Sequence, residues 1–200
     1  MKKRFIYGFA AFAMAFSLVA CGGESEENTE EGTENTETTE EVVAVENTID
    51  AEASTINWWA MDGEEKGHTG TIAIKEGTYT VEGDKVTAAA MSVDMGSMTS
   101  DSEKLTGHLQ TADFFDIENY GSTTFTFNKH EDGVVYGTLS VVGMEMAVEA
   151  PVTVSEGAVA VSDFSVDMVQ LPFFQTERAE KPEAEWHNTN IWFNANIVAK

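Results

Sequence analysis

Apolar and polar residues alternate along most of the chain after residue 54, with the period of two that is typical of half-buried β-strands. Ile72 and Ile74 share one face of such a segment, and Phe125 and Phe127 share one face of another. A turn is expected at Glu76-Gly77, because the alternation stops there. The pattern predicts about eight antiparallel strands between residues 54 and 200.

The parity of the apolar positions changes once, across Ser162-Asp163. Val159 and Val161 keep one face of their segment, whereas Phe164 and Val166 keep the opposite parity. An extra residue in one strand of an antiparallel pair shifts the parity in this way and curves the sheet. We therefore expect a β-bulge at this point.

Two segments interrupt the alternation. Ser100, followed three residues later by Glu103, has the residues of a capping box, and Leu105 and Leu109 follow at helical spacing, which predicts a short helix over 101–111. Residues 171–187 contain two of the three prolines and are expected to form a long loop. About eight strands and one helix predict a single all-β antiparallel barrel, with a β-sandwich as the alternative.

The N-terminal segment has the pattern of a secretion signal. Lys2, Lys3 and Arg4 precede an apolar run over 5–20, which is short for a membrane-spanning helix. The run ends in Leu18-Val19-Ala20-Cys21, which resembles the bacterial lipobox that precedes a lipidated cysteine. We expect residues 1–20 to be a lipoprotein signal peptide and Cys21 to be the membrane anchor. The alternative is a general secretion signal with an incidental cysteine.

Residues 21–53 are interpreted as an acidic, low-complexity linker. After Cys21 they contain twelve Asp or Glu residues and no Lys or Arg, interleaved with Thr, Asn, Ser and Gly. Such a composition has too little apolar surface to offset the entropy of ordering. Val42, Val43 and Val45 are the exception and suggest a frayed first strand. The expected boundaries are thus 1–20, 21–53 and 54–200.

The composition excludes some classes of function. Thirty-five acidic residues against eleven basic ones give a formal charge of −24, which argues against binding nucleic acid or anionic lipid head groups electrostatically. The single cysteine excludes an intrachain disulfide and a cysteine-based metal site. At 42% hydrophobic residues, the chain is nevertheless able to bury a core.

An ordered series of short motifs resembles the YceI-like family over nearly all of 54–200. The motifs are Gly67-His68-Thr69-Gly70-Thr71-Ile72, Ser92-Val93-Asp94-Met95-Gly96-Ser97-Met98, Leu105-Thr106-Gly107-His108-Leu109, Asp113-Phe114-Phe115-Asp116, Tyr120-Gly121 with Thr124-Phe125, and Gly137-Thr138-Leu139-Ser140-Val141-Val142-Gly143. The resemblance implies an exported, lipocalin-like eight-stranded barrel that binds a polyisoprenoid or similar lipid without catalysis. Gly121 and the stretch 168–174 depart from the family's usual pattern, so the mouth of the cavity is expected to differ.

A barrel that holds an isoprenoid needs inward residues that are apolar and leave a lumen. With the resemblance, the candidate ligand-binding residues are Ile72, Ile74, Met91, Val93, Phe114, Phe115, Phe125, Phe127, Leu139, Val141, Phe164 and Val166. The alternative for the same residues is an ordinary packed core with nothing bound. His68 and His108 are the candidates for contacting a head group, such as that of a quinone or a phosphate.

Other classes of function remain as alternatives. His68, His108 and His187, with Asp113 and Asp116, would have to converge to hold a catalytic or stored metal ion, and no H-x-H or H-E-x-x-H spacing supports this. No nucleophile elbow or phosphate loop is present. The other alternative function is that of an envelope scaffold or adhesion module. The expected partners are a polyisoprenoid-type lipid and the membrane, with a homodimer as a further possibility and no cofactor.

Overall fold

The computed structural model describes residues 43–200, so the expected signal peptide, Cys21 and most of the expected linker lie outside the described residues. The strands are β1 (Ala44–Thr48), β2 (Thr55–Asp62), β3 (Glu65–Glu82), β4 (Lys85–Asp94), β5 (Ser122–Glu131), β6 (Val134–Val141), β7 (Met144–Ser155), β8 (Ala158–Asp167) and β9 (Asn190–Ile197). The helices are α1 (Glu103–Leu109) and α2 (Pro172–Glu180), with 3₁₀ turns at Met95–Ser97 and Glu183–Glu185. No helix in residues 43–200 is long and apolar enough to cross a bilayer.

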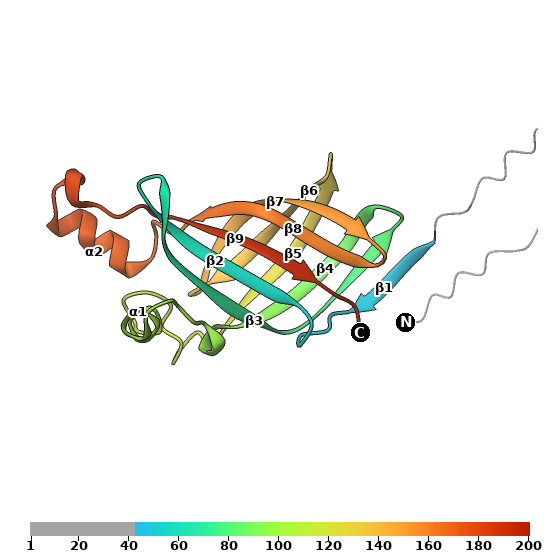
Figure 1. The fold of residues 1–200 in the computed structure, drawn as a ribbon, viewed down its shortest axis with the longest axis horizontal. Helices are drawn as coiled ribbons and strands as arrows, with labels where there is room; N and C mark the ends of the chain where they lie inside the picture. Colours follow the sequence, from blue (N-terminus) through green and yellow to red (C-terminus); the bar gives the residue numbers. More distant parts are fainter. Residues whose placement is uncertain (1–42) are drawn as a thin grey trace, which may run out of the picture. The chain divides into compact units, whose positions relative to one another are not determined.

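The strands form a closed antiparallel barrel (Figure 1). Eight of them follow one another in the order β3-β2-β9-β8-β7-β6-β5-β4, and pairing between β3 and β4 closes the ring. The additional strand β1 pairs with the C-terminal part of β3. Both helices lie at one end of the barrel, here called the helical end, and the β3–β4, β5–β6 and β7–β8 turns lie at the other, the hairpin end (Figure 1). The predicted all-β barrel of eight strands is confirmed.

The long strand β3 corrects one prediction. A turn was expected at Glu76-Gly77, but the backbone continues as one strand through a register shift between Ile74 and Glu76. A Cβ atom at Gly77 would lie 2.7 Å from the Ala90 carbonyl oxygen, so glycine allows the two strands to approach each other here. The glycine therefore marks a bulge within a strand, a pattern that looks the same as a turn in the sequence.

The bulge expected in β8 is confirmed. The register of β8 against β9 shifts between Val161 and Phe164, which are the residues on either side of Ser162-Asp163. The β7–β8 ladder also ends here, at the pair Val152–Val161. Beyond this pair, β7 is paired with β6 and β8 with β9.

The helices differ from prediction in two ways. The N-cap of α1 is Ser102, whose hydroxyl accepts from the Leu105 backbone N–H, and not Ser100, whose hydroxyl accepts from Ser102 N–H. The expected loop at 171–187 contains α2, with Pro172 in its first turn. Proline is well suited to that position because its missing N–H would have no partner there. Pro172 thus begins a helix and is not the loop residue that its sequence context predicts.

The folded domain extends N-terminally of residue 54. Val45 lies in β1, opposite Val81 of β3, as the frayed first strand suggested. Ile49 is 3% exposed and forms a bridge with Ala199 near the C-terminus. Residues 44–49, which were expected to belong to the linker, therefore pack against the barrel toward its hairpin end.

Candidate functional site

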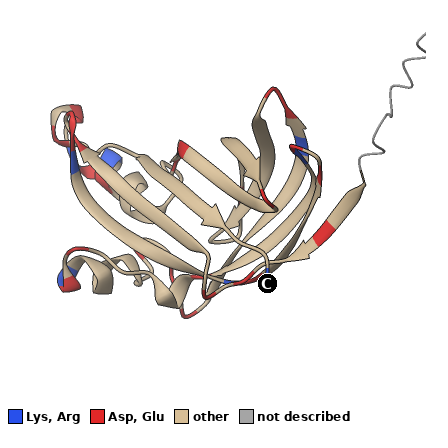
Figure 2. Cartoon of the chain, turned by 45° about the vertical axis from the view of Figure 1, so that its right-hand side comes forward, with Lys and Arg blue, Asp and Glu red and all other residues tan. Residues whose placement is uncertain are grey.

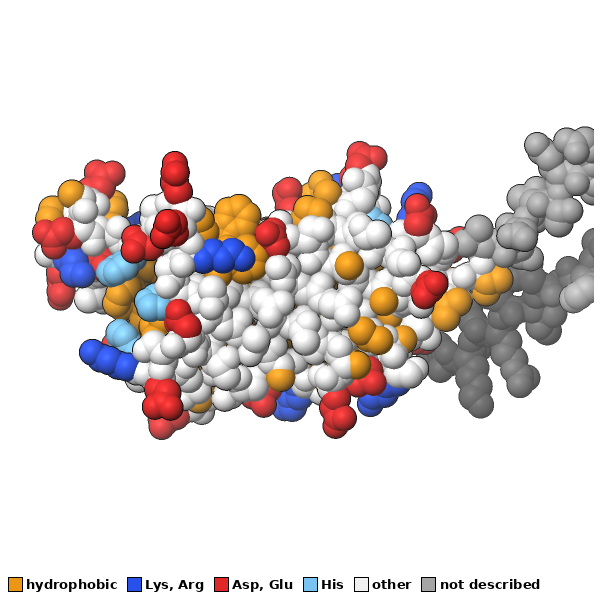
Figure 3. All heavy atoms as spheres, viewed as in Figure 1, with side chains coloured by type: hydrophobic (Ala, Val, Ile, Leu, Met, Phe, Trp, Pro, Cys, Tyr) orange, Lys and Arg blue, Asp and Glu red, His pale blue; other side chains and the backbone are white. Residues whose placement is uncertain are grey.

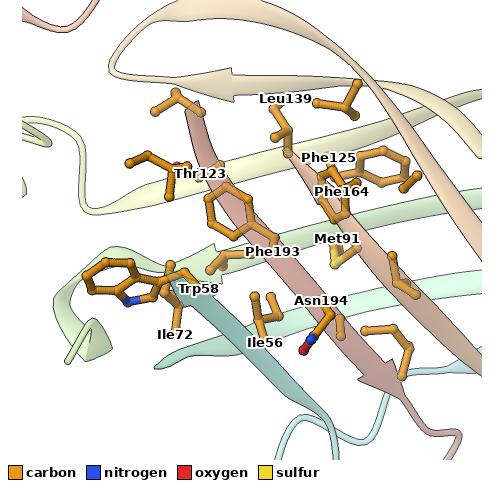
Figure 4. Close-up of a pocket in the computed structure, with 18 of the residues that line it drawn as sticks. Ile56, Trp58, Ile72, Met91, Thr123, Phe125, Leu139, Phe164, Phe193 and Asn194 are labelled. Carbon is orange, nitrogen blue, oxygen red and sulfur yellow. The ribbon is translucent and has the colours of Figure 1, made fainter. Parts of the chain in front are cut away.

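An apolar cavity of about 190 Å³ runs inside the barrel. Its wall at the helical end includes Leu109, Phe114 and Leu171, and its wall at the hairpin end includes Ile49 and Ile197. Figure 4 shows side chains from several strands pointing into this space from opposite sides. An apolar cavity of such a size stays dry and accepts apolar guests, because water finds too few hydrogen-bond partners in it.

Strand alternation builds this cavity. On β9, for example, Ile191, Phe193 and Ile197 line it. On β2, Trp58 lines the cavity while the next residue, Trp59, faces outward and stacks on Trp192 at 6.2 Å. Successive side chains of a strand point to opposite faces, so each strand gives the lumen every second residue.

The lining carries no Asp, Glu, Lys, Arg or His residue. The charged residues of the barrel lie mainly at its turns, helices and outer surface (Figure 2). A charge placed inside the lumen would lose its hydration without gaining an ionic partner. The cavity is therefore chemically suited to a neutral, apolar ligand.

Most of the candidate ligand-binding residues lie on the cavity wall. Those that line it are Ile72, Met91, Val93, Phe114, Phe115, Phe125, Leu139, Val141 and Phe164. Ile74, Phe127 and Val166 do not line it; they pack into the surrounding apolar clusters instead. All twelve candidates therefore lie in or beside the barrel's apolar core, but only the nine that line the cavity can contact a ligand in it.

Sequence reasoning missed a large part of the wall. Val148 and Ala150 of β7 and Ile191 and Phe193 of β9 also line the cavity. The signal for them was present, because both segments alternate apolar and polar residues. Trp58 and Thr123 also line the cavity. Neither was predicted to do so, because Trp58 is large enough to fill a lumen and Thr123 is polar.

Aromatic side chains close the helical end. Phe114, which follows α1, stacks on Phe173 of α2 with ring centroids 4.4 Å apart and also meets Phe174 edge-on. The Phe173 backbone N–H donates to the Asp113 carbonyl oxygen at 2.7 Å. Offset and edge-to-face contacts of this kind stabilise by about 0.5–1.5 kcal/mol each beyond area burial. This cluster ties α2 to the segment that follows α1 and covers the cavity.

The two histidines predicted to contact a head group do not line the cavity. His68 pairs with Asp101 (Nδ1–Oδ1 3.0 Å) and His108 with Asp113 (Nε2–Oδ2 3.2 Å), and both rings are about half exposed. Hydrogen bonds from Ser100 and His68 lower the pKa of Asp101. Histidine side chains gather at the helical end beside exposed apolar surface (Figure 3), but they face solvent, on the outer side of the aromatic cluster.

The third histidine of this region, His187, pairs with a buried carboxylate. Glu177 of α2 is 4% exposed and accepts from His187 N–H (2.8 Å), Lys181 Nζ (3.0 Å) and His187 Nδ1 (2.6 Å). Burial alone would raise the pKa of Glu177, but these hydrogen bonds outweigh it and hold the pKa at about 2. Each of these three histidines thus pairs with a different carboxylate, and residues 43–200 contain no cluster of three or more potential metal-ligating side chains.

A closed antiparallel barrel around an elongated apolar cavity defines a lipocalin-like architecture. The sequence model of the YceI-like domain matches residues 48–183, and the chain therefore belongs to the YceI-like family. This match agrees with the resemblance drawn from the motifs. A search of curated proteins finds no match to the chain.

Solved structures share this fold at low sequence identity. BcnA from Burkholderia cenocepacia is 16% identical, with a TM-score of 0.57 over 76% of this chain and 99% of that one. A polyisoprenoid binding domain from Saccharophagus degradans, implicated in plant cell wall breakdown, is 13% identical, with a TM-score of 0.51 over 78% and 97% of the two chains. The likeness extends over nearly the full length of both relatives.

Proposed function

We propose that this chain is a non-enzymatic lipid-binding protein that holds the tail of a polyisoprenoid-type lipid inside the barrel. The observation that carries the proposal is the continuous apolar cavity with no charged residue in its lining. The structural likeness to a polyisoprenoid binding domain supports the same ligand class. Membership of the YceI-like family, whose barrel is a binding-protein fold, supports a binding role over catalysis.

The driving force for binding is burial of the apolar tail. Each methylene-sized unit moved from water into the cavity contributes about 0.8 kcal/mol, offset in part by the ordering of a flexible chain. Met91, Met95, Met98 and Met168 line the wall, and their unbranched side chains adapt to an irregular guest. Binding therefore needs no ionic contact.

The proposal includes export and anchoring. The lipobox-like Leu18-Val19-Ala20-Cys21 supports lipidation at Cys21 and a place in the cell envelope, on the periplasmic or surface side of the outer membrane. Ala44, the first residue of β1, pairs with Glu82 beside the β3–β4 turn. The described chain thus begins at the hairpin end of the barrel, opposite the helices.

A matched pair of variants on β7 tests the binding role. Ala150 lines the cavity, whereas Ala147 on the same strand is exposed on the outer face. In the full chain, extracted from a bacterial host in mild detergent, Ala150→Phe is expected to lower the co-purified lipid per chain severalfold and Ala147→Phe to leave it unchanged. Equal lipid content in both variants would overturn the proposal.

A second pair keeps the test valid if Ala150→Phe fails to fold. Ala89 of β4 lines the cavity and its neighbour Ala88 is exposed. Ala89→Leu adds a smaller group to the lumen and is expected to reduce lipid content, with Ala88→Leu as its control. Circular dichroism of each variant shows whether the barrel is intact.

A further inference from the structure

The few polar side chains of the cavity wall differ in whether they have a hydrogen-bond partner. The Trp58 indole N–H donates to the Thr99 carbonyl oxygen at 3.0 Å, and the Tyr79 hydroxyl donates to the Gly157 carbonyl oxygen. These two groups already have protein partners, so neither is free to bind a ligand.

Besides Thr123, the remaining polar residues of the wall are Asn194 on β9 and Thr78 on β3. The Asn194 amide accepts from Asn57 Nδ2 and donates to Asp163 Oδ1, both at 2.9 Å. Thr78 is exposed, in contrast to the buried Tyr79 that follows it. Asn194 is thus held by protein partners and Thr78 is open to solvent, so neither is a buried polar group without a partner.

Thr123 is different. It lies on β5 opposite Val93 in the register, has the parity of the inward-facing Phe125 and is 8% exposed. No hydrogen bond within residues 43–200 includes the Thr123 hydroxyl, and this oxygen is not among atoms that are fully sealed and unpaired, so it retains some accessible surface. Thr123 thus adds to the cavity wall, on the side of the helical end (Figure 4), a side chain whose hydroxyl has no protein partner.

We infer that Thr123 selects the head group of the lipid: it binds a neutral oxygen, the hydroxyl of an isoprenoid alcohol or the carbonyl of a quinone-type ring, and the site excludes phosphorylated isoprenoids. This inference rests on the proposed function and assigns the ligand's orientation. The head lies near Thr123 and the tail extends toward Ile49, Val86 and Ile197 at the hairpin end.

The preference for a neutral head group follows from the small number of polar groups in the cavity wall. A buried hydroxyl without a partner is unfavourable, and a single ligand oxygen satisfies it. A phosphate would bring several acceptors and at least one negative charge to a wall with no cation and one free donor. The exposed carboxylates at the helical end, among them Asp101 and Asp113, add repulsion for an anion near that end.

The test compares three probes of one tail length: geranylgeraniol, the corresponding saturated or unsaturated hydrocarbon, and geranylgeranyl phosphate. Delipidated full chain in mild detergent is titrated with each probe while intrinsic tryptophan fluorescence or displacement of a fluorescent lipid is followed. The wild type is expected to bind the alcohol about tenfold more tightly than the hydrocarbon and the phosphate, the factor that one hydrogen bond in an apolar site supplies.

Thr123→Val keeps the shape of the side chain and removes the hydroxyl. It is expected to remove the preference for the alcohol over the hydrocarbon, while Thr124→Val, at the exposed neighbouring position, retains it. A Thr123→Val variant that still prefers the alcohol, or a wild type that binds the phosphate as tightly as the alcohol, would overturn the inference. If the hydrocarbon binds and the alcohol binds no better, only the inference fails; if neither binds, the proposed function fails with it.

Discussion

The ring of Phe125 lies directly against the backbone of Gly137, on the neighbouring strand β6. A Cβ atom at Gly137 would overlap the Phe125 ring and lie 2.8 Å from the Thr126 carbonyl oxygen. The missing side chain of Gly137 thus lets the Phe125 ring pack closely against the backbone of β6.

Gly137→Ala is expected to push the Phe125 ring toward the lumen. Overpacking of this kind destabilises by about 1–3 kcal/mol, and the displaced ring also reduces the space for lipid. Urea unfolding and lipid content per chain measure the two effects. Gly107→Ala is the control: its Cβ meets nothing within 4 Å in α1, and alanine there is expected to stabilise by about 0.5–1 kcal/mol. An unchanged stability in Gly137→Ala would contradict the close contact.

Gly70→Ala is expected to break the contact between Trp58 and Thr99. A Cβ atom at Gly70 would lie 2.5 Å from Trp58 Nε1 and overlap the Thr99 carbonyl oxygen, the acceptor of the indole N–H. Loss of the hydrogen bond and the forced displacement together cost about 1–3 kcal/mol, visible in urea unfolding and in the tryptophan near-ultraviolet spectrum.

A double-mutant cycle with Trp58→Phe checks the cause of this loss. If Gly70→Ala acts through the indole, the two substitutions are non-additive, because the second removes a group the first has already displaced. Additive effects would show that Gly70 is constrained by some other contact.

We expect the stability of the helical end to fall at acid pH, because the pKa of Glu177 is lowered in the folded chain. Its pKa is about 2 in the folded chain against an ordinary 4.5. The stabilisation it provides is therefore fully present above pH 4.5 and is lost as the pH falls toward 2, and it amounts to at most about 3 kcal/mol. Hydrogen exchange of the α2 amides at a series of pH values measures it.

Glu177→Gln removes this source of pH dependence. The variant is expected to show faster exchange in α2 at neutral pH, because a neutral amide cannot pair with Lys181 and His187 in the same way. It should also show a flatter pH response between 4.5 and 2. The same steep response in variant and wild type would assign the acid sensitivity to other groups.

Cys21→Ser tests the anchor. If Cys21 is lipidated, the substitution removes the acyl chains, which provide membrane affinity of about 0.8 kcal/mol for each buried methylene, and the chain is expected to move from the membrane fraction to the soluble fraction. Ser25→Ala is the matched control in the same segment. A Cys21→Ser chain that stays with the membrane and keeps its mass would contradict lipidation.

The features that the sequence predicted well are those that depend on a single local pattern. The alternation of Ile72, Phe125 and their neighbours predicted the barrel, and the change of parity at Ser162-Asp163 predicted the bulge, because a strand's inward face is determined by its own residues. Alternation alone did not distinguish a cavity from a packed core, and the resemblance to the YceI-like family was needed to predict the cavity.

The features that were missed depend on contacts between distant segments. Gly77 looked like a turn because only its approach to Ala90, across the strand pair, shows that it is a bulge. Pro172 looked like a loop residue because α2 is held by Phe114 and by the Asp113 carbonyl, both about sixty residues earlier. Thr123 was not noticed because a threonine in a strand is ordinary until its hydroxyl is found without a partner.

Native mass spectrometry of the full chain, released from mild detergent, tests the central claim most directly. The account predicts a population that carries the additional mass of one lipid, which is lost on denaturation and partitions into hexane. A chain that shows only the mass of the polypeptide with any covalent modification, and takes up no isoprenoid lipid on incubation, would contradict the account and leave the barrel as a scaffold.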